Sequence, residues 1–184
     1  MLQEDYAIVA EHELLRKVSD TENNFIERKT SLNTDGWLKD ARLILQLYDL
    51  RREPEMRKAR HWWAFQFSPR SADDFMKVAW AAGSQENNWL RQVAGYWGMA
   101  ASFVLQGALN EELFLQPTVS GEMFVIFAKV HPFVKELREK LGDSEVFLNI
   151  EKVIMHTKWG RDRLKFVLKR VEMMREKMAE KGAR

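Results

Sequence analysis

Two carboxylates near the start of the chain have a spacing that could serve a metal site. Glu22 and Glu27 lie in the segment ENNFIERK, and Lys29 follows them. Paired acids can hold a divalent metal that activates water, provided that a rigid scaffold supplies a third ligand. Glu22, Glu27 and Lys29 are therefore the catalytic candidates of this sequence, and metal-dependent cleavage is the chemistry that they would serve.

Other reactive residue types are scattered or missing. The chain has no cysteine, and no two of its four histidines stand at helical ligand spacing. The sequence contains no G-x-S-x-G motif and no glycine-rich phosphate loop. Outside the acid pair we therefore expect no metal centre, no cofactor and no enzyme activity.

A second polar group flanks the most apolar stretch of the chain, residues 92–110. Arg91 precedes this stretch, and Glu111, Glu112 and Glu122 follow it. If Arg91 is buried, it needs one of these carboxylates as a partner, because an unpaired buried charge is costly. We interpret the group as structural, and a small-molecule pocket between facing helices is the alternative.

The elements that must position these residues are helices. Apolar residues recur at helical spacing almost throughout, and 7 tryptophans and 11 phenylalanines supply material for a core. The pattern predicts an all-α bundle of about six to eight helices, with a short segment near residues 22–29 that could be extended. We expect residues 1–35 to form an N-terminal extension. Residues 36–184 should form one helical domain that ends in a basic amphipathic helix.

Three expectations concern the packing of these helices. Ala94, Gly95, Gly98 and Ala101 are small and should let a neighbouring backbone approach closely. Glycine inside a helix costs about 1 kcal/mol relative to alanine, which predicts a packing reason for it. Ser144 should cap the helix that reaches about His156. The helix of residues 37–50 should turn these side chains inward: Trp37, Leu38, Ala41, Ile44, Leu45 and Tyr48.

The last helix combines an apolar stripe with positive charge. Residues 158–184 contain ten Lys or Arg against four Asp or Glu. The stripe repeats every three or four residues, and it consists of Leu164, Val167, Val171, Met174 and Met178. It predicts either packing against the bundle or a seam with another chain. The basic candidates for contact with nucleic acid or an acidic partner are Lys165, Lys169, Arg170, Arg175 and Lys177.

The segment ENNFIERKTSLNTDGWLKDA resembles the start of the AlbA-type domain of Schlafen-like bacterial proteins, over about residues 13–41. The resemblance implies a first strand that carries Glu22, Glu27 and Lys29. In some Schlafen members such acids hold a metal for RNA cleavage, and others bind nucleotide or nucleic acid. The resemblance stops at Ala41, because the chain then continues with helical spacing instead of glycine-rich strands. We therefore expect these carboxylates to be solvated rather than catalytic.

About residues 40–178 resemble a family of uncharacterised bacterial helical domains. The stretches that carry this resemblance are LYDLRREPEMRKAR, NNWLRQVAGYWGMAASFVLQGALNEELF and GEMFVIFAKVHPFVKELR. The resemblance implies an α-helical fold and no established activity.

The sequence as a whole predicts a non-enzymatic protein-interaction or structural module. It would bind a protein partner or itself through the last helix or an exposed tryptophan-bearing face. The alternative is a nucleic-acid-associated protein that uses the basic last helix and the AlbA-like segment.

Location and other partners follow from composition. No membrane association is expected, because the uncharged stretch of residues 92–110 includes Gln92, Gln106 and Asn110. No small-molecule ligand is evident. The lack of cysteine, together with acidic first residues that do not have the layout of a signal peptide, predicts a cytoplasmic protein.

Overall fold

The computed structural model describes residues 34–182 of the chain, with side chains for residues 36–177. The chain divides into two units, residues 1–42 and residues 43–184. Helix α2 (Thr34–Arg52) begins in the first unit and ends in the second. The predicted extended segment and the candidates Glu22, Glu27 and Lys29 lie outside the described residues, so they stay predictions, as does the division at residue 35.

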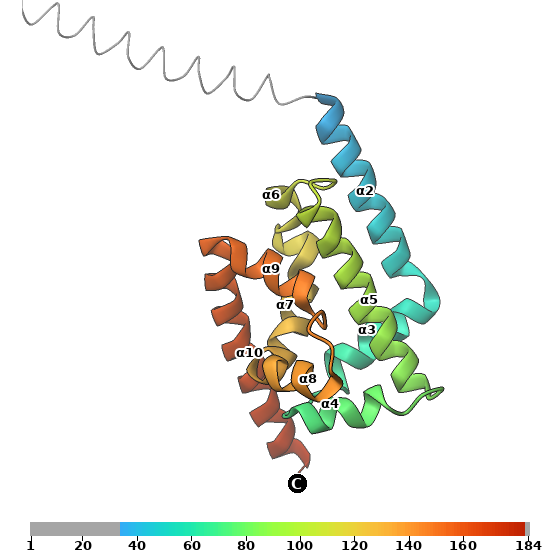
Figure 1. Cartoon of the computed structure of the whole chain (residues 1–184), viewed down its shortest axis with the longest axis vertical. Coiled ribbons are helices and arrows are strands. Elements are labelled where there is room, and N and C mark those ends of the chain that lie inside the picture. The colour runs from blue at the N-terminus through green and yellow to red at the C-terminus, as the bar shows by residue number, and fades with distance from the viewer. Residues whose placement is uncertain (1–33, 183–184) are drawn as a thin grey trace, which may run out of the picture. The chain divides into compact units, whose positions relative to one another are not determined.

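Helices make up the regular structure of the described residues, which confirms the all-α prediction (Figure 1). After α2 come α3 (Pro54–Phe65), α4 (Ala72–Ala79), α5 (Gln85–Leu105), the single-turn α6 (Glu111–Phe114), α7 (Pro117–Val130), the 3-10 helix η1 (His131–Phe133), α8 (Val134–Leu141), α9 (Leu148–His156) and α10 (Lys158–Gly182). Within residues 34–182, eight of these helices have eight residues or more, in agreement with the six to eight expected.

Local capping signals explain where several helices begin. Pro54 opens α3, and the backbone N–H of Met56 donates to the Glu53 carboxylate at 2.8 Å. Ser71 Oγ accepts from the backbone N–H of Asp74 at 3.1 Å and so caps α4. The expected cap by Ser144 is wrong, because α9 begins after Phe147, whose backbone has a positive φ of 58°.

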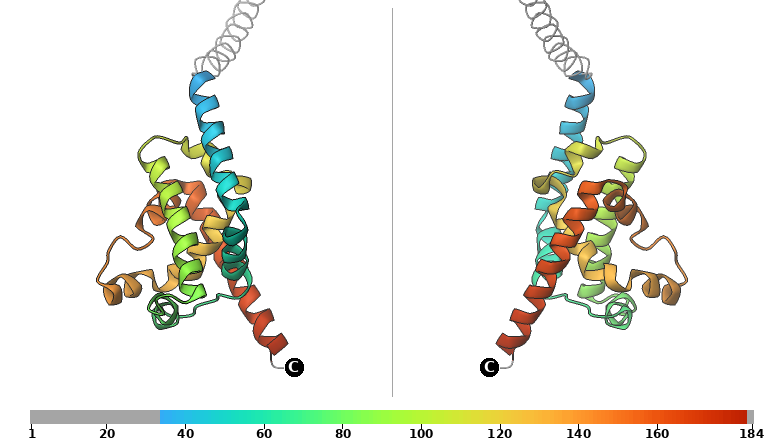
Figure 2. Two further views of the ribbon diagram at one scale, coloured as in Figure 1. Left: turned by 90° about the vertical axis from the view of Figure 1, so that its right-hand side faces the viewer. Right: turned by 90° about the vertical axis from the view of Figure 1, so that its left-hand side faces the viewer.

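The packing order of the second unit places α5 and α7 inside. Helix α5 packs on α3, α4 and α9, and α7 packs on α10 and α9. Figure 1 shows α7, in yellow, between α5 and α10. In the right-hand view of Figure 2, α10 runs along the front of the second unit, and no other helix covers it.

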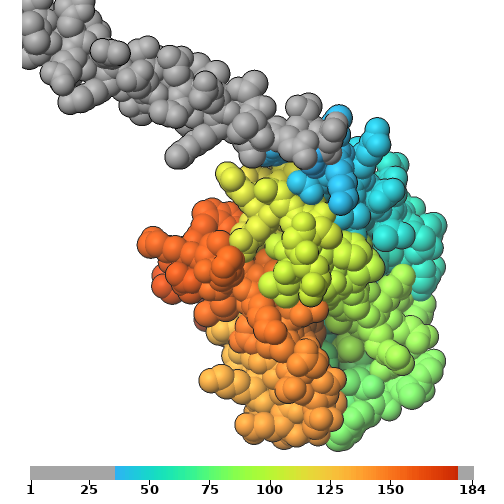
Figure 3. Space-filling view, turned by 45° about the horizontal axis from the view of Figure 1, so that its top comes forward, coloured from blue at the N-terminus to red at the C-terminus, as the bar shows by residue number. Residues whose placement is uncertain are grey.

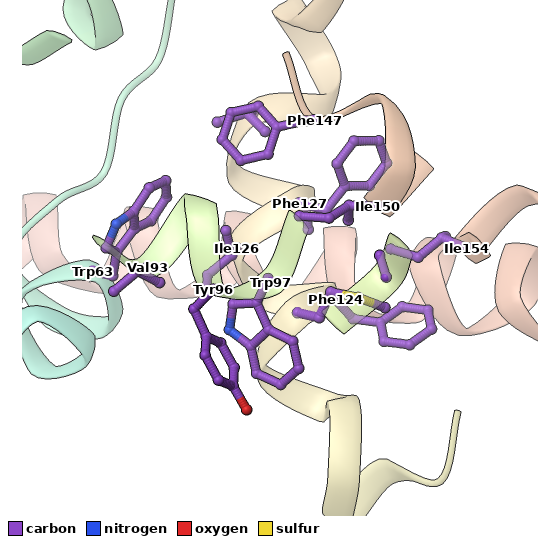
Figure 4. Packing of buried hydrophobic residues seen from close by; sticks show 14 of the residues in the cluster. Trp63, Val93, Tyr96, Trp97, Phe124, Ile126, Phe127, Phe147, Ile150 and Ile154 are labelled. Atoms are coloured by element: carbon purple, nitrogen blue, oxygen red, sulfur yellow. The ribbon is translucent and has the colours of Figure 1, made fainter. Parts of the chain in front are cut away.

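Aromatic side chains from these helices form one core (Figure 4). Trp63 of α3 and Trp97 of α5 are each 1% exposed, and Phe127 of α7 is fully buried. Tyr96 meets Trp97 edge to face with ring centroids 5.0 Å apart. Burial of each such side chain stabilises the fold by about 1.5–3 kcal/mol, so these rings set the arrangement of α3, α5 and α7.

The second half of α2 packs with a face that differs from the predicted one. Leu47 is 5% exposed, whereas Leu45 and Tyr48 are 63% and 52% exposed, so their expected burial is wrong. A hydrogen bond sets this rotation, because the hydroxyl of Tyr96 donates to the Leu47 carbonyl at 2.9 Å. Arg51 follows one turn later on the same inward face. The expected inward residues before position 43 belong to the first unit.

The glycines of α5 do not serve close backbone packing, contrary to expectation. A Cβ added at Gly95 or Gly98 would meet no neighbouring atom within 4 Å. Gly160 in the first turn of α10 is the opposite case, because a Cβ there would overlap the carbonyl oxygen of Ile154. The close approach between helices therefore lies at the junction of α9 and α10.

Alanine at Gly98 and alanine at Gly160 should change stability in opposite directions. Gly98→Ala should raise the unfolding free energy by about 1 kcal/mol, because alanine favours the helix and the added methyl group meets open space. Gly160→Ala should lower it by about 1–3 kcal/mol, because the methyl group displaces backbone at Ile154. Urea denaturation measures both, with Gly95→Ala as a control that should behave like Gly98→Ala. A lower unfolding free energy for Gly98→Ala would contradict the finding that a Cβ at Gly98 meets open space.

Candidate functional site

The polar residues predicted around α5 do not converge on Arg91. Arg91 is exposed, so the condition for a buried pair is not met. The Glu111 carboxylate instead lies 2.9 Å from His156 Nδ1 and accepts from it in the tautomer that carries the proton there, and the His156 side chain is 72% exposed. Glu112 is exposed. These residues form separate contacts rather than one site.

Glu122 of α7 has two arginine partners that sequence reasoning missed. Its carboxylate accepts from Arg51 Nη2 at 2.6 Å and from Arg60 Nε at 2.8 Å, and its side chain is 17% exposed. The guanidinium of Arg51 also lies 5.0 Å from the ring centroid of Trp97. Two cations around one poorly solvated carboxylate compensate its loss of hydration. The cluster joins the end of α2 to α3, α5 and α7, which fits a structural role.

Lys129 of α7 is a buried charged residue, with only 6% of its surface exposed. Its Nζ donates to the carbonyls of Trp63, Ala64 and Phe67, with the bond to Ala64 at 3.1 Å and that to Phe67 at 2.7 Å. These carbonyls lie at the end of α3, where helical partners run out. Burial lowers the pKa of Lys129 to about 8, and the charge of nearby Arg175 lowers it as well.

Replacement of Lys129 should change both the unfolding free energy and its dependence on pH. Lys129→Met should lower the unfolding free energy at pH 7 by about 1–3 kcal/mol, because three carbonyls lose their donor. The pKa of Lys129 falls from 10.5 in the unfolded chain to about 8 in the folded one. Between these values the unfolded chain binds more protons, so the wild-type unfolding free energy rises with pH, and the variant lacks this rise. Urea titrations at pH 8 and 10 should show a growing difference, and a shrinking one contradicts the lowered pKa.

The predicted apolar stripe of α10 is mostly buried. Leu164, Val167 and Val171 are 3%, 4% and 5% exposed, in the helix that packs against α7 and α9. Met174 is 49% exposed, and the side chain of Met178 lies outside the described residues. Of the two predicted roles of the stripe, packing against the bundle is therefore the one that Leu164, Val167 and Val171 have.

Arg175 packs against the bundle, unlike the other predicted basic candidates of α10. Its side chain is 11% exposed, and Nη2 donates to the carbonyls of Pro69 at 2.7 Å and Lys129 at 3.2 Å. Lys169, Arg170 and Lys177, the candidates near it, are exposed. Lys165 is also exposed and lies 3.5 Å from Asp162. Arg175 therefore fixes the second half of α10 against the α3–α4 connection.

A second stripe on α10 lies beside the buried stripe, and most of its side chains are exposed. We call it the outer face, and it consists of Trp159, Arg163, Phe166, Arg170, Met173, Met174 and Lys177. Trp159, at its start, also meets the Phe124 ring of α7 edge to face with centroids 5.7 Å apart. Most of these positions follow the same spacing of three and four residues as the buried stripe, so they share one side of the helix. Apolar and basic residues alternate along it, which is the signal that a search for purely apolar heptads missed.

The outer face exposes large apolar side chains beside positive charge. Trp159, Phe166 and Met173 are 45%, 50% and 52% exposed. The guanidinium groups of Arg163 and Arg170 lie 5.3 Å and 6.0 Å from the Phe166 ring centroid, within cation–π range. Asp162 lies one turn before Phe166 and pairs with Lys158 at 2.9 Å, so the exposed side of α10 carries an excess of basic residues with some acidic ones among them.

The described residues form neither a metal site nor a membrane span. Within residues 34–182, no three histidine, aspartate or glutamate side chains lie close enough together to hold a metal ion. Of the helices that the structure describes, none is long and apolar enough to cross a membrane.

Comparison with known proteins places the chain in a family. A model for a domain of unknown function, DUF4760, matches residues 37–159, which is more than half of the chain. The chain belongs to the DUF4760 family. This confirms the resemblance of the larger part to an uncharacterised domain family, whereas the AlbA resemblance of residues 13–41 receives no support. No curated protein and no solved structure matches the chain.

The extent of the DUF4760 match separates two parts of the structure. The match covers α3 to α9, with the Glu122 cluster and Lys129. It ends at Trp159, so most of the outer face lies beyond the matched residues.

Two arginines of α10 should differ sharply when each is replaced by alanine. Arg175→Ala should lower the unfolding free energy by about 1–3 kcal/mol, because the carbonyls of Pro69 and Lys129 lose a charged donor. Arg170→Ala should change it by less than about 0.5 kcal/mol, because Arg170 is exposed. Thermal and urea denaturation measure both. An equal decrease of the unfolding free energy in the two variants would show that Arg170 also stabilises the fold and is not available to a partner.

Proposed function

We propose that this DUF4760 protein is a non-enzymatic binding module that docks an acidic, partly apolar protein partner on the outer face of α10. The observation that carries the proposal is the alternation of exposed apolar and basic side chains there, on a helix in which basic residues outnumber acidic ones. Aromatic residues, methionine and arginine are the types enriched in protein interfaces. The lack of cysteine supports a reducing compartment such as the cytoplasm.

The apolar half of the outer face favours a protein over a nucleic acid. Phe166, Met173 and Met174 are about half exposed, and a partner that covers them gains affinity from their burial. Methionine adapts its shape to an apolar surface but offers nothing to a phosphate. A phosphate backbone is bound by cations, which the exposed lysines elsewhere on α10 would supply equally well. Bases would stack on the Phe166 ring but gain little from Met173 and Met174.

The charge of the outer face also bears on self-association. Two copies that met through this face would bring Arg163, Arg170 and Lys177 against the same residues of the other copy. Like charges at an interface cost binding energy, so a second copy is a poor occupant. An acidic partner is complementary, and its rate of association should fall as salt screens the charges.

A matched set of probes tests the proposal. The first is a labelled amphipathic helical peptide built from leucine and glutamate, and the second has lysine in place of every glutamate. The third is a single-stranded RNA of similar length. We expect the wild-type chain to bind the acidic peptide at least tenfold more tightly than the basic one in fluorescence anisotropy. Arg170→Glu and Phe166→Ser should each weaken binding about tenfold, the equivalent of 1.4 kcal/mol.

Lys152→Glu is the control, because Lys152 is an exposed basic residue of α9 outside the outer face. It should leave binding of the acidic peptide unchanged. Tighter binding of RNA than of the acidic peptide would favour the nucleic-acid alternative, whether or not Phe166→Ser weakens it. Equal binding of the acidic and basic peptides would end the proposal.

A further inference from the structure

A cavity of about 540 Å³ opens between α5 and the segment that joins α8 to α9. Figure 3 shows the orange surface of α8 and the following segment next to the green surface of α4 and α5. Phe75, Leu90, Phe147 and Ile150 supply much of its apolar lining. The cavity has the size and lining of sites that bind small molecules, and it shares no residue with the outer face.

The first observation that favours a ligand in this cavity is the glycine at position 98. It lies inside α5 and lines the cavity, and a Cβ at this position would meet no neighbouring atom within 4 Å. Glycine lowers helix stability relative to alanine, yet no part of the protein occupies the space that it leaves. Glycine in such a place allows a ligand to approach the backbone closely.

The backbone of Phe147 is an independent second argument. Phe147 has a φ of 58°, in the left-handed region that a bulky side chain rarely adopts. Its ring forms part of the cavity wall and meets the Phe75 ring edge to face with centroids 5.9 Å apart. Strained residues of this kind cluster at ligand sites, because the strain holds a side chain in a functional position.

Charged groups at the cavity decide the class of ligand. Arg91 of α5 lines it and makes no ion pair or hydrogen bond within the described residues. Asp143 and Glu145 line it from the α8–α9 segment. Neither carboxylate has a salt-bridge partner in the part of the chain that the structure describes, although Asp143 accepts from the backbone N–H of Glu145 at 2.9 Å. One cation and two anions therefore remain available on two different walls.

We propose that this cavity binds an amphipathic zwitterion, namely an apolar amino acid or a short apolar peptide. Its side chain lies against Phe75, Leu90 and Phe147. Its carboxylate binds the Arg91 guanidinium, and its ammonium group faces Asp143 and Glu145. Such a ligand uses both charges of the site, whereas a simple anion or cation would meet a like charge.

Isothermal titration calorimetry on the full chain tests this with three probes. L-phenylalanine and the dipeptide Phe-Phe carry both charges, and N-acetyl-phenylalanine amide carries neither. We expect at least one of the zwitterions to bind at least tenfold more tightly than the uncharged probe. Binding by the dipeptide alone would identify a peptide as the ligand, and binding by phenylalanine would identify an amino acid.

Three variants separate the cavity from the fold. Gly98→Leu fills the cavity and favours the helix, so zwitterion binding should fall at least tenfold while the melting temperature does not fall. Gly121→Leu is the matched control, because Gly121 of α7 also has no atom within 4 Å of an added Cβ and does not line the cavity. Arg91→Ala should weaken zwitterion binding about tenfold, and it tests the site even if Gly98→Leu does not fold.

The proposal is overturned if neither zwitterion binds at millimolar concentration. It is equally overturned if the uncharged probe binds as tightly as the zwitterions, or if Arg91→Ala and Gly98→Leu leave binding unchanged.

Discussion

The buried amino group of Lys129 is the interaction on which the arrangement of the second unit depends. It donates to the carbonyl of Ala64 in the last turn of α3 and to that of Phe67 just after the helix, so the buried cation and these buried carbonyls satisfy one another. The carbonyl of Lys129 accepts from Arg175 of α10. One residue of α7 thus joins α3 and α10, and the aromatic core closes around this connection.

The position of α10 explains why its two stripes have different uses. Leu164 and Val171 face the bundle and Arg175 holds the end of the helix, so the side beside the buried stripe remains mostly exposed. That side carries Phe166 and Met173 among basic residues. The proposed partner surface is therefore a consequence of how the core is closed. The cavity beside Gly98 lies on other helices and within the DUF4760 match, so the two proposed sites stand independently.

Comparison of prediction and structure shows which signals are local. Pro54 and Ser71 stand at helix starts, where their residue types alone favour a start, because a cap acts within three residues of its own position. Ser144 offers the same signal but does not cap α9, since packing places Phe147 at the start of the helix in a strained conformation. The apolar positions of α2 likewise mislead, because Leu45 and Tyr48 are as hydrophobic as the buried Leu47 and only contacts with other helices choose between them. The Glu122 cluster could not be predicted, because its arginines lie more than sixty residues away.

The sequence by itself determined the helical class, several of the helix ends and the basic character of the last helix, since each depends on residue types and spacings along a short stretch of chain. Only the tertiary structure decided which face of α2 and α10 is buried, which carboxylate meets which arginine, and that Gly98 borders open space while Gly160 does not. These outcomes depend on long-range contacts, in which packing and desolvation outweigh the small energy differences between alternative helix faces.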